Sequence, residues 1–202
     1  MKMKLLTAIA VLAMAAVASA DIYVPDGQFE KADHSADWVT AQGGGATTFA
    51  YPTTGGNGGG YATMAKSGGW GVLVNPIVAG TEGGGVTIGS MGVTAGATNT
   101  FTVDLITILG TATGAMKVEA WGSNANLGNS GEIAPASASA IWQTLTFDWL
   151  VPVGADKLIF VPVAGEASTI GYDNVGVVPE PATMGLFAVA AGFLMFVRRF
   201  RA

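Results

Sequence analysis

Alternating apolar and polar residues identify strand-forming segments in the middle of the chain. Residues 100–105 place Phe101, Val103 and Leu105 on one face, because successive side chains of a strand point to opposite sides. Residues 141–149 alternate in the same way, which predicts an antiparallel strand with one covered face. The expected covered face of that segment consists of Ile141, Leu145, Phe147 and Trp149.

Residues 158–163 are almost entirely apolar, which predicts a central strand, although Pro162 favours an edge or a bulge near its end. Shorter strands are expected between glycine clusters, at 47–51, 61–65, 71–74, 86–88, 115–121 and 169–177. No helical period interrupts them, and about nine or ten short strands predict an all-β sandwich of two sheets.

The first twenty residues have the layout of a secretory signal peptide. Lys2 and Lys4 precede the apolar run 5–17, and Ala18-Ser19-Ala20 supplies small residues before a cut at Asp21. The apolar run is shorter than the roughly 20 residues that a membrane anchor needs. We therefore expect residues 1–20 to direct export through the inner membrane and to be removed.

A second apolar segment stands at the C-terminal end. Pro179-Glu180-Pro181 precedes residues 182–197, which carry no charge, and a basic tail follows at 198–202. A helix over 182–197 is about 24 Å long, short against a hydrocarbon core of about 30 Å, and bilayer thinning or flanking residues can close that gap. The terminal arginines favour a single transmembrane helix with its C-terminus in the cytoplasm.

This order of parts resembles the PEP-CTERM sorting signal of Gram-negative and related environmental bacteria. The resemblance implies that Pro179, Glu180 and Pro181, together with Arg198 and Arg199, form a sorting motif for an exosortase-type membrane protease. It also implies a transient membrane anchor at residues 179–202, followed by a location at the cell surface or outside the cell. A plain single-pass anchor, in which the tail is retained, is the alternative.

The body between these ends, residues 21–178, is acidic and free of cysteine. It holds four lysines and thirteen acidic residues, a formal charge of −9. A nucleic-acid partner is excluded, because phosphates require a basic face. The absence of cysteine also excludes thiol nucleophiles, thiolate metal sites and a lipoprotein anchor. Neutral polysaccharide, protein and calcium remain as partners.

Several segments of the body resemble the galactose-binding-like jelly roll, the fold of many carbohydrate-binding modules. They are Asp26-Gly27-Gln28-Phe29-Glu30 near the start, residues 93–105 and 141–147 in the middle, and residues 170–177 near the end. In that family the opening and closing segments share a structural calcium ion. The resemblance implies carboxylate ligands from Glu30 and Asp173, with the backbone carbonyl around Gln28 completing the oxygen shell. The alternative is that both carboxylates only hydrogen-bond to strand ends.

Carbohydrate modules present flat rings beside polar groups, so exposed aromatic residues are the candidates for ligand binding. Glycine-rich surroundings favour Tyr51, Tyr61, Trp70 and Trp121. Three further rings are expected in the core or in cross-strand positions: Trp38, Trp142 and Trp149.

Enzymatic activity is not expected. The single histidine, His34, stands among acidic residues in an expected surface loop, and no nucleophile motif surrounds a serine. The glycine runs do not precede helices and are therefore not phosphate loops. Two hypotheses follow: a non-catalytic module that binds carbohydrate or matrix at the cell surface, or a structural and adhesive protein without a discrete ligand site.

Overall fold

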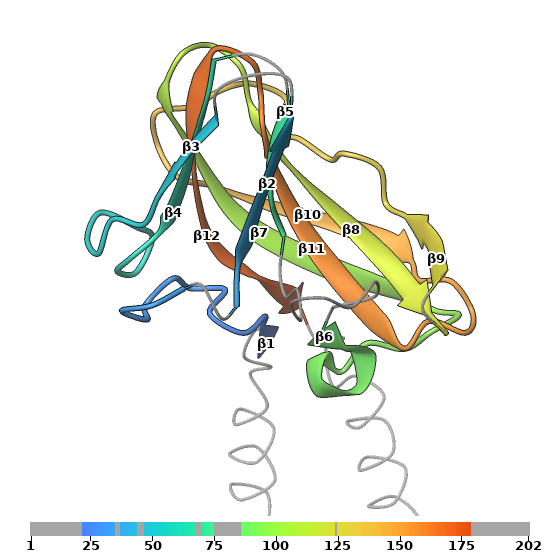
Figure 1. The fold of residues 1–202 in the computed structure, drawn as a ribbon. Coiled ribbons are helices and arrows are strands. Elements are labelled where there is room, and N and C mark those ends of the chain that lie inside the picture. Colours follow the sequence, from blue (N-terminus) through green and yellow to red (C-terminus); the bar gives the residue numbers. More distant parts are fainter. Residues whose placement is uncertain are drawn as a thin grey trace, which may run out of the picture. The chain divides into compact units, whose positions relative to one another are not determined.

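The computed structural model describes residues 22–34, 37–43, 47–67, 70–74, 86–123 and 125–178, and they form one compact unit within Ile22–Val178 (Figure 1). The expected signal peptide, the apolar segment 182–197 and the sorting residues lie outside the described part. Within that part, no helix has the length and apolar character needed to cross a membrane.

Twelve strands form two antiparallel sheets that pack face to face (Figure 1). The first sheet has the order β10 (Gln143–Leu150), β7 (Thr98–Leu109), β12 (Ser168–Val178), β4 (Ala62–Lys66), β3 (Thr47–Ala50), and β1 (Ile22–Tyr23) pairs with β12. The second has the order β2 (Val39–Gly43), β5 (Trp70–Val74), β11 (Lys157–Ala164), β8 (Gly114–Gly122), β9 (Ala125–Asn129), and β6 (Val86–Thr87) pairs with β11. The only helical element among the described residues is a 3-10 turn at Ile88–Met91.

All nine expected strands are confirmed, with ends shifted by a few residues. The strand expected at 141–149 begins at Gln143, so Ile141 lies before it and is 76% exposed, contrary to the expectation that it is covered. Three strands were not expected: β1, β2 and β9. They are short or rich in glycine, alanine and asparagine, and such segments become strands through pairing with a neighbour rather than through their own pattern.

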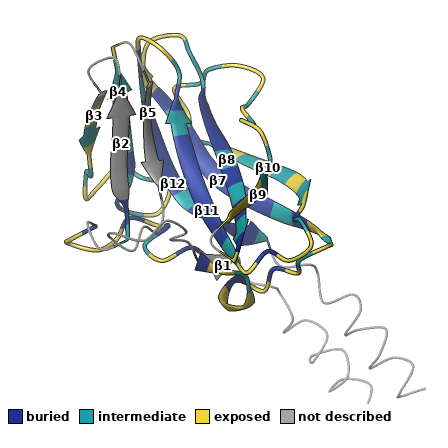
Figure 2. Cartoon of the chain, turned by 45° about the vertical axis from the view of Figure 1, so that its right-hand side comes forward, coloured by how far each residue is buried: buried dark blue, intermediate teal, exposed yellow. Residues whose placement is uncertain are grey.

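The core lies between the two sheets (Figure 2). From the first sheet Phe101, Val103 and Leu105 point inward and are at most 2% exposed, as their alternation predicts. Leu158 and Phe160 point inward from the second sheet and are fully buried. The rings of Phe101 and Phe160 meet with centroids 6.0 Å apart, which locks the two layers together.

The prediction that Pro162 marks an edge or a bulge is wrong. Pro162 lies within β11, which pairs with β8 in unbroken register and has β5 and β6 on its other side. Opposite Pro162 on β8, the backbone N–H and C=O of Met116 both hydrogen-bond to Ile133, at 2.8 and 2.9 Å. The pair Met116–Pro162 therefore makes no backbone hydrogen bond between β8 and β11. The missing N–H of Pro162 therefore interrupts no hydrogen bond to β8.

Candidate functional site

The outer face of the second sheet forms a groove with an apolar floor. Ile159 and Val161 of β11 are 7% and 4% exposed, yet they lie outside the core cluster because they point away from the first sheet. They line a hollow of about 500 Å³, and a second hollow of about 600 Å³ adjoins it through Val163 and Glu132. The near-continuous apolar pattern of residues 158–163 thus serves two surfaces: the core on one side and the groove floor on the other.

Charged side chains form the rim of this groove. Lys117 and Glu119, both on β8, make an ion pair of 2.7 Å. Glu119 Oε2 accepts hydrogen bonds from Trp121 Nε1 at 3.4 Å and from Asn126 Nδ2 at 3.3 Å. Glu119 therefore holds an indole ring and an amide in place at one end of an apolar floor, and Glu132 lines the wall.

The four aromatic candidates do not form one site. Trp121 lies on β8 beside the groove and is partly exposed. Trp70 is the first residue of β5 in the same sheet, and its side chain is outside the described part. Tyr51 and Tyr61 flank the loop between β3 and β4 in the first sheet. The glycine-rich surroundings predicted four exposed rings, but Tyr51, Tyr61 and Trp121 are only partly exposed, and the strand order separates them onto two sheets.

Tyr51 belongs to a stacked cluster rather than to an open surface. Its ring lies 4.4 Å from that of His34 and 6.2 Å from that of Phe29, and Phe29 in turn stacks on Trp38 at 5.0 Å. Burial, and then the nearby Asp26 carboxylate, raises the pKa of Tyr51. The expected core position of Trp38 is confirmed, since it is 2% exposed.

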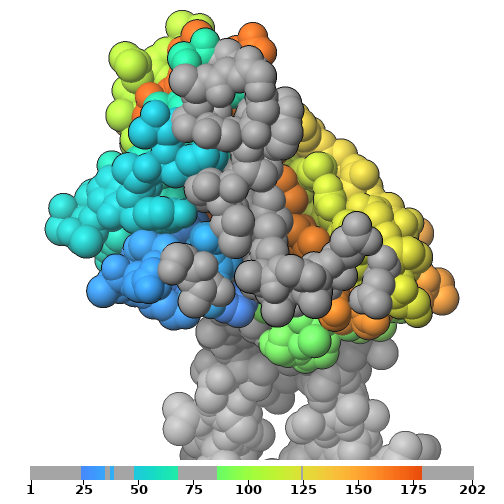
Figure 3. Space-filling model, in the orientation of Figure 1, coloured from blue at the N-terminus to red at the C-terminus, as the bar shows by residue number. Residues whose placement is uncertain are grey.

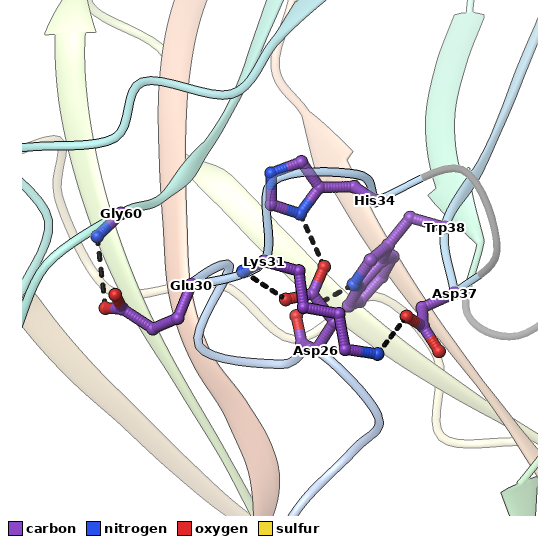
Figure 4. Close-up of polar contacts among 7 residues, drawn as sticks. All are labelled: Asp26, Glu30, Lys31, His34, Asp37, Trp38 and Gly60. Atoms are coloured by element: carbon purple, nitrogen blue, oxygen red, sulfur yellow. Dashed lines mark hydrogen bonds and ion pairs between the residues drawn. The ribbon is translucent and has the colours of Figure 1, made fainter.

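His34 is buried, which corrects the prediction of a surface loop. It is 8% exposed, and its Nδ1 lies 2.5 Å from Asp26 Oδ2 (Figure 4). Asp26 also accepts a hydrogen bond from Trp38 Nε1 at its backbone carbonyl, and Lys31 forms an ion pair with Asp37. The charged groups around His34 therefore connect residues of the segments 26–34 and 37–38 to one another.

Tyr61 packs against Trp142 on the outer face of the first sheet. The two rings meet edge to face with centroids 5.6 Å apart, and Trp142 Nε1 donates to the carbonyl of Gly55 at 3.1 Å. Gly171 leaves the space for Tyr61, because a Cβ there would lie 3.1 Å from its ring. Trp142 was expected in the core or in a cross-strand position. In the structure its ring holds the loop 52–60 against the first sheet. Trp149 packs against the core as expected.

A buried carboxylate holds the same loop from beneath. Asp104 on β7 is 4% exposed although it points away from the core. Its Oδ2 accepts from Asn57 Nδ2 at 2.7 Å and from Asn174 Nδ2 at 2.8 Å, and its Oδ1 accepts from Thr144 Oγ1 at 2.6 Å. The charge of Asp104 is thus compensated by three neutral donors from three separate segments.

Asp173, the partner of Asp104 across β7 and β12, is not compensated in this way. It is 1% exposed, and its Oδ1 accepts from the backbone N–H of Asn174 at 2.7 Å, whereas its Oδ2 has no hydrogen-bond partner among the described residues. Burial, opposed by backbone hydrogen bonds from Asn174 and Asn57 and reinforced by the charges of Asp104 and Glu30, raises the pKa of Asp173 to about 7. A buried carboxylate oxygen without a donor is costly, and a cation is the usual remedy.

The loop between β3 and β4, cyan in Figure 3, lies against the N-terminal segment in blue. This loop also brings further oxygens to the Asp173 carboxylate. Glu30 Oε1 accepts a hydrogen bond of 3.1 Å from the backbone N–H of Gly60 (Figure 4). A Cβ built on Gly56 would lie 2.2 Å from the carbonyl oxygen of Gly60, 2.7 Å from Asp173 Oδ2 and 2.9 Å from the carbonyl oxygen of Gly59. Gly56 therefore faces a cradle of three oxygens that only the absence of a side chain leaves open.

The donor set of this cradle fits calcium, which prefers carboxylate and carbonyl oxygens. The charge of Glu30 is near enough to Asp173 to contribute to its raised pKa. The side-chain amide of Gln28 lies 3.4 Å from Asn174 Oδ1, and the role of its carbonyl stays a prediction. Among the described residues, no group of three or more His, Cys, Asp and Glu side chains forms a metal-binding cluster, so a calcium ion here would depend on backbone oxygens.

Comparison with known families identifies the C-terminal end. Residues 177–201 match the PEP-CTERM protein-sorting motif. The chain carries a PEP-CTERM sorting signal. That signal is an export and membrane-anchoring address in the proteins that bear it, and it begins within β12, at the last two residues of the described body. No curated protein matches the sequence.

Several solved structures with a similar fold are carbohydrate-binding modules. The C-terminal family 22 carbohydrate-binding module of Clostridium thermocellum Xyn10B has 15% identity and a TM-score of 0.55, covering 81% of this chain and 98% of its own. The CBM22-1 xylan-binding domain of Paenibacillus barcinonensis Xyn10C has 11% identity and a TM-score of 0.53, covering 79% and 99%. The enzymatically active domain of tailspike protein 4 from bacteriophage CBA120 has 15% identity and a TM-score of 0.53, covering 77% and 21%. At these identities the likeness establishes the β-sandwich fold.

Proposed function

We propose that this protein is a non-catalytic carbohydrate-binding module of the cell surface, delivered by its PEP-CTERM tail. Its body is a galactose-binding-like jelly roll, and its tail is the substrate of an exosortase-type membrane protease. The tail holds the protein in the inner membrane until processing places the body at the surface or in the extracellular polymer.

The groove on the second sheet carries this proposal. An apolar floor with a few fixed polar groups at its rim is the arrangement expected of a small-ligand site. Trp121 offers a ring face for stacking on a sugar, and Glu119 and Lys117 offer hydrogen-bonding groups beside it. Because three glutamates surround the groove and the body is acidic, a neutral polysaccharide fits better than an acidic one.

The charged groups of the groove support binding rather than catalysis. Glu119 is engaged by three partners, and the other carboxylates of the lining, Glu132 and Glu166, come from separate segments. His34 and Asp26, the buried histidine–carboxylate pair, belong to the segment that packs beside the first sheet.

Direct binding measurements test this function. Residues 21–178 are titrated with neutral xylan and glucan oligosaccharides by calorimetry, after screening on a glycan array. We expect binding that is lost in Trp121→Ala and retained in the matched control Trp142→Ala, whose ring lies on the other sheet. If the folded body binds no glycan, the alternative remains: a structural or adhesive protein without a discrete ligand site.

We also propose a structural calcium ion, held by Glu30 and Asp173 with the carbonyl oxygen of Gly60 and that of Gln28. Such an ion supplies positive charge to a buried carboxylate that lacks a donor. Asp173 on β12, Glu30 after the first turn and the loop 52–60 are far apart in sequence, so the ion would tie three segments together. This role is to stabilise the fold, and the sugar-binding groove lies on the other sheet.

A glycine substitution tests the cradle without removing a charge. In Gly56→Ala the new Cβ occupies the space between Gly60 O and Asp173 Oδ2, so we expect calcium to raise the melting temperature of the wild-type body but not that of the variant. Gly89→Ala is the control, since a Cβ there meets nothing within 4 Å. Equal stabilisation of all three proteins by calcium would place the ion elsewhere, and no stabilisation of any would remove it.

A further inference from the structure

The end of the sandwich at which the chain leaves for its sorting tail carries an exposed apolar patch. β12 ends there at Val178, and β1 pairs beside it, with Ile22 opposite Val177. The connection from β10 to β11 turns at the same end (Figure 1). Val153 in that connection is 84% exposed, and Leu150 at the end of β10 is 60% exposed.

The patch is continuous with the edge strand of the second sheet. Leu127 of β9 is 39% exposed, and its Cδ1 would lie 2.9 Å from a Cβ on Gly122, which would also meet the carbonyl oxygen of Gly154 at 2.2 Å. Leu127 therefore lies against the turn that carries Val153. We define the end patch as Leu127, Leu150, Pro152 and Val153.

The register of the first sheet places this patch close to the exit of the chain. Val178 pairs with Thr100 of β7, and Leu150 pairs with Thr98 of the same strand. Two strand spacings separate β10 from β12, so Leu150 lies about 10 Å from Val178. From Val178 to the expected start of the apolar span at Ala182 is four residues, which reach at most about 14 Å.

We propose that the end patch rests on the lipid surface of the exporting membrane while the sorting tail is still attached. This inference rests on the proposed function, since it requires residues 182–197 to be in the membrane. A tether of four residues keeps the patch at a high local concentration near the bilayer, so a few apolar side chains suffice for contact.

Charge favours lipid contact through apolar groups rather than through attraction to headgroups. Asp148 and Asp156 flank the patch and are exposed, and the body carries a formal charge of −9. An anionic membrane surface repels such a body. The contact is therefore shallow, limited to the side chains that project beyond these carboxylates, and added salt should strengthen it by screening the repulsion.

Exposure by itself does not single out this end. The opposite end of β7 carries Ile108 and Leu109, which are 46% and 69% exposed. What distinguishes the end patch is its distance from Val178, because Leu109 pairs with Thr169 at the far end of β12. Leu109 is thus a matched control: an exposed apolar residue on the same sheet, at the end that the tether cannot bring to the membrane.

The absence of cysteine allows a direct depth measurement on the full chain. Val153→Cys, Leu109→Cys and Ala191→Cys are each labelled with an environment-sensitive nitrobenzoxadiazole probe and reconstituted into phosphatidylethanolamine–phosphatidylglycerol vesicles. We expect the probe at 153 to brighten several-fold and to be quenched by lipids that carry a nitroxide near the headgroup. The probe at 109 stays as dim as in buffer, and the probe at 191, in the tail, is quenched by deep nitroxides.

Each outcome decides a separate point. If the probe at 153 stays as dim as in buffer while the probe at 191 is quenched by deep nitroxides, the end-patch contact is overturned and the anchored tail is not. If deep nitroxides do not quench the probe at 191, the tail is not inserted, and the inference then fails together with the anchoring step. If the signal at 153 disappears on dilution to one chain per vesicle, the patch contacts a second copy rather than lipid, which also overturns the proposal.

Discussion

Each sheet buries a few residues on its outer face, but with opposite chemistry. On the first sheet two of them are carboxylates, Asp104 and Asp173, and the chain's own loop 52–60 covers them. On the second sheet the buried residues are Ile159 and Val161, and they form the floor of a groove. A face closed by internal polar bonds is structural, whereas an apolar face with a polar rim is available to a ligand.

The same difference separates the two uses of charge. The Asp104 side chain accepts hydrogen bonds from three side chains of three segments, so removing it breaks three bonds at once, although Asn174 Nδ2 keeps a second acceptor in the carbonyl of Asn57. Glu119 is only part-buried, and water can replace it for Lys117 and Asn126. Substitutions on the first sheet should therefore change stability, and substitutions on the second should change binding.

The largest effect is expected for Asp104→Ala. Three donors lose their acceptor, which costs about 3 kcal/mol or more of unfolding free energy and lowers the melting temperature by roughly 10 °C. Urea denaturation measures the loss. Asp148→Ala is the control, because its exposed carboxylate accepts only from Thr100 Oγ1 and should cost less than about 1 kcal/mol. Similar losses in both variants would contradict the compensated role of Asp104.

The second effect concerns Asp173 and pH in the presence of chelator. Since burial raises the pKa of Asp173 from 3.8 to about 7, the folded state holds its proton more tightly than the unfolded chain does. The contribution of Asp173 to the free energy of unfolding is therefore greatest below pH 4. It decreases as pH rises to about 7, by up to roughly 1.4 kcal/mol per pH unit. Asp173→Asn should flatten this dependence, and calcium should restore stability at pH 7 only in the wild type. Denaturant titrations from pH 4 to 8 measure both, and an identical slope in the variant would assign the dependence to another group.

A smaller effect is expected for Glu119→Ala in the groove. The variant frees Trp121 and Asn126 from their shared acceptor, so glycan affinity should fall about fivefold to tenfold through loss of positioning. The unfolding free energy should change by less than about 1 kcal/mol, because the pair with Lys117 is at the surface. Calorimetric titration measures affinity, and a large loss of stability with unchanged affinity would reverse the comparison between the two sheets.

The smallest effect is expected for Trp142→Ala on the first sheet. The ring is partly exposed and closes the loop through one hydrogen bond and one edge-to-face contact, together worth about 1–2 kcal/mol. Stability should fall by that amount, measured by thermal unfolding, while glycan affinity is unchanged. Lost glycan binding in this variant would move the ligand site to the first sheet.

Much of the secondary structure was predictable because it is local. A period of two residues is visible in 100–105 and 143–149 whatever the strands pair with, and the glycine clusters mark where they turn. The motifs that flank Glu30 and Asp173 are also visible along the chain, and the calcium ion that they would share stays a prediction. β2 and β9 were not predictable, since neither carries an alternating pattern of its own.

The candidate site was predictable only in part. Trp121 could be named from its surroundings, but Glu119, Lys117 and the groove floor could not, because residues 158–163 fit a fully covered central strand equally well. Asp104 gave no signal beyond an alternating polar position. Its donors come from residues 57, 144 and 174, and no local pattern predicts that meeting.

The sequence by itself determined the sorting signal, the composition and much of the secondary structure: a motif at residues 177–201, an acidic body without cysteine, and nine of the strands. These depend on composition, order and near-neighbour geometry, which a linear chain displays directly. Tertiary structure alone decided that Tyr61 and Trp121 lie on different sheets, that His34 is buried, and that Ile159 faces a groove. Those outcomes depend on which strands pair and which loops cover them, and pairing joins residues as distant in sequence as Ile22 and Val177.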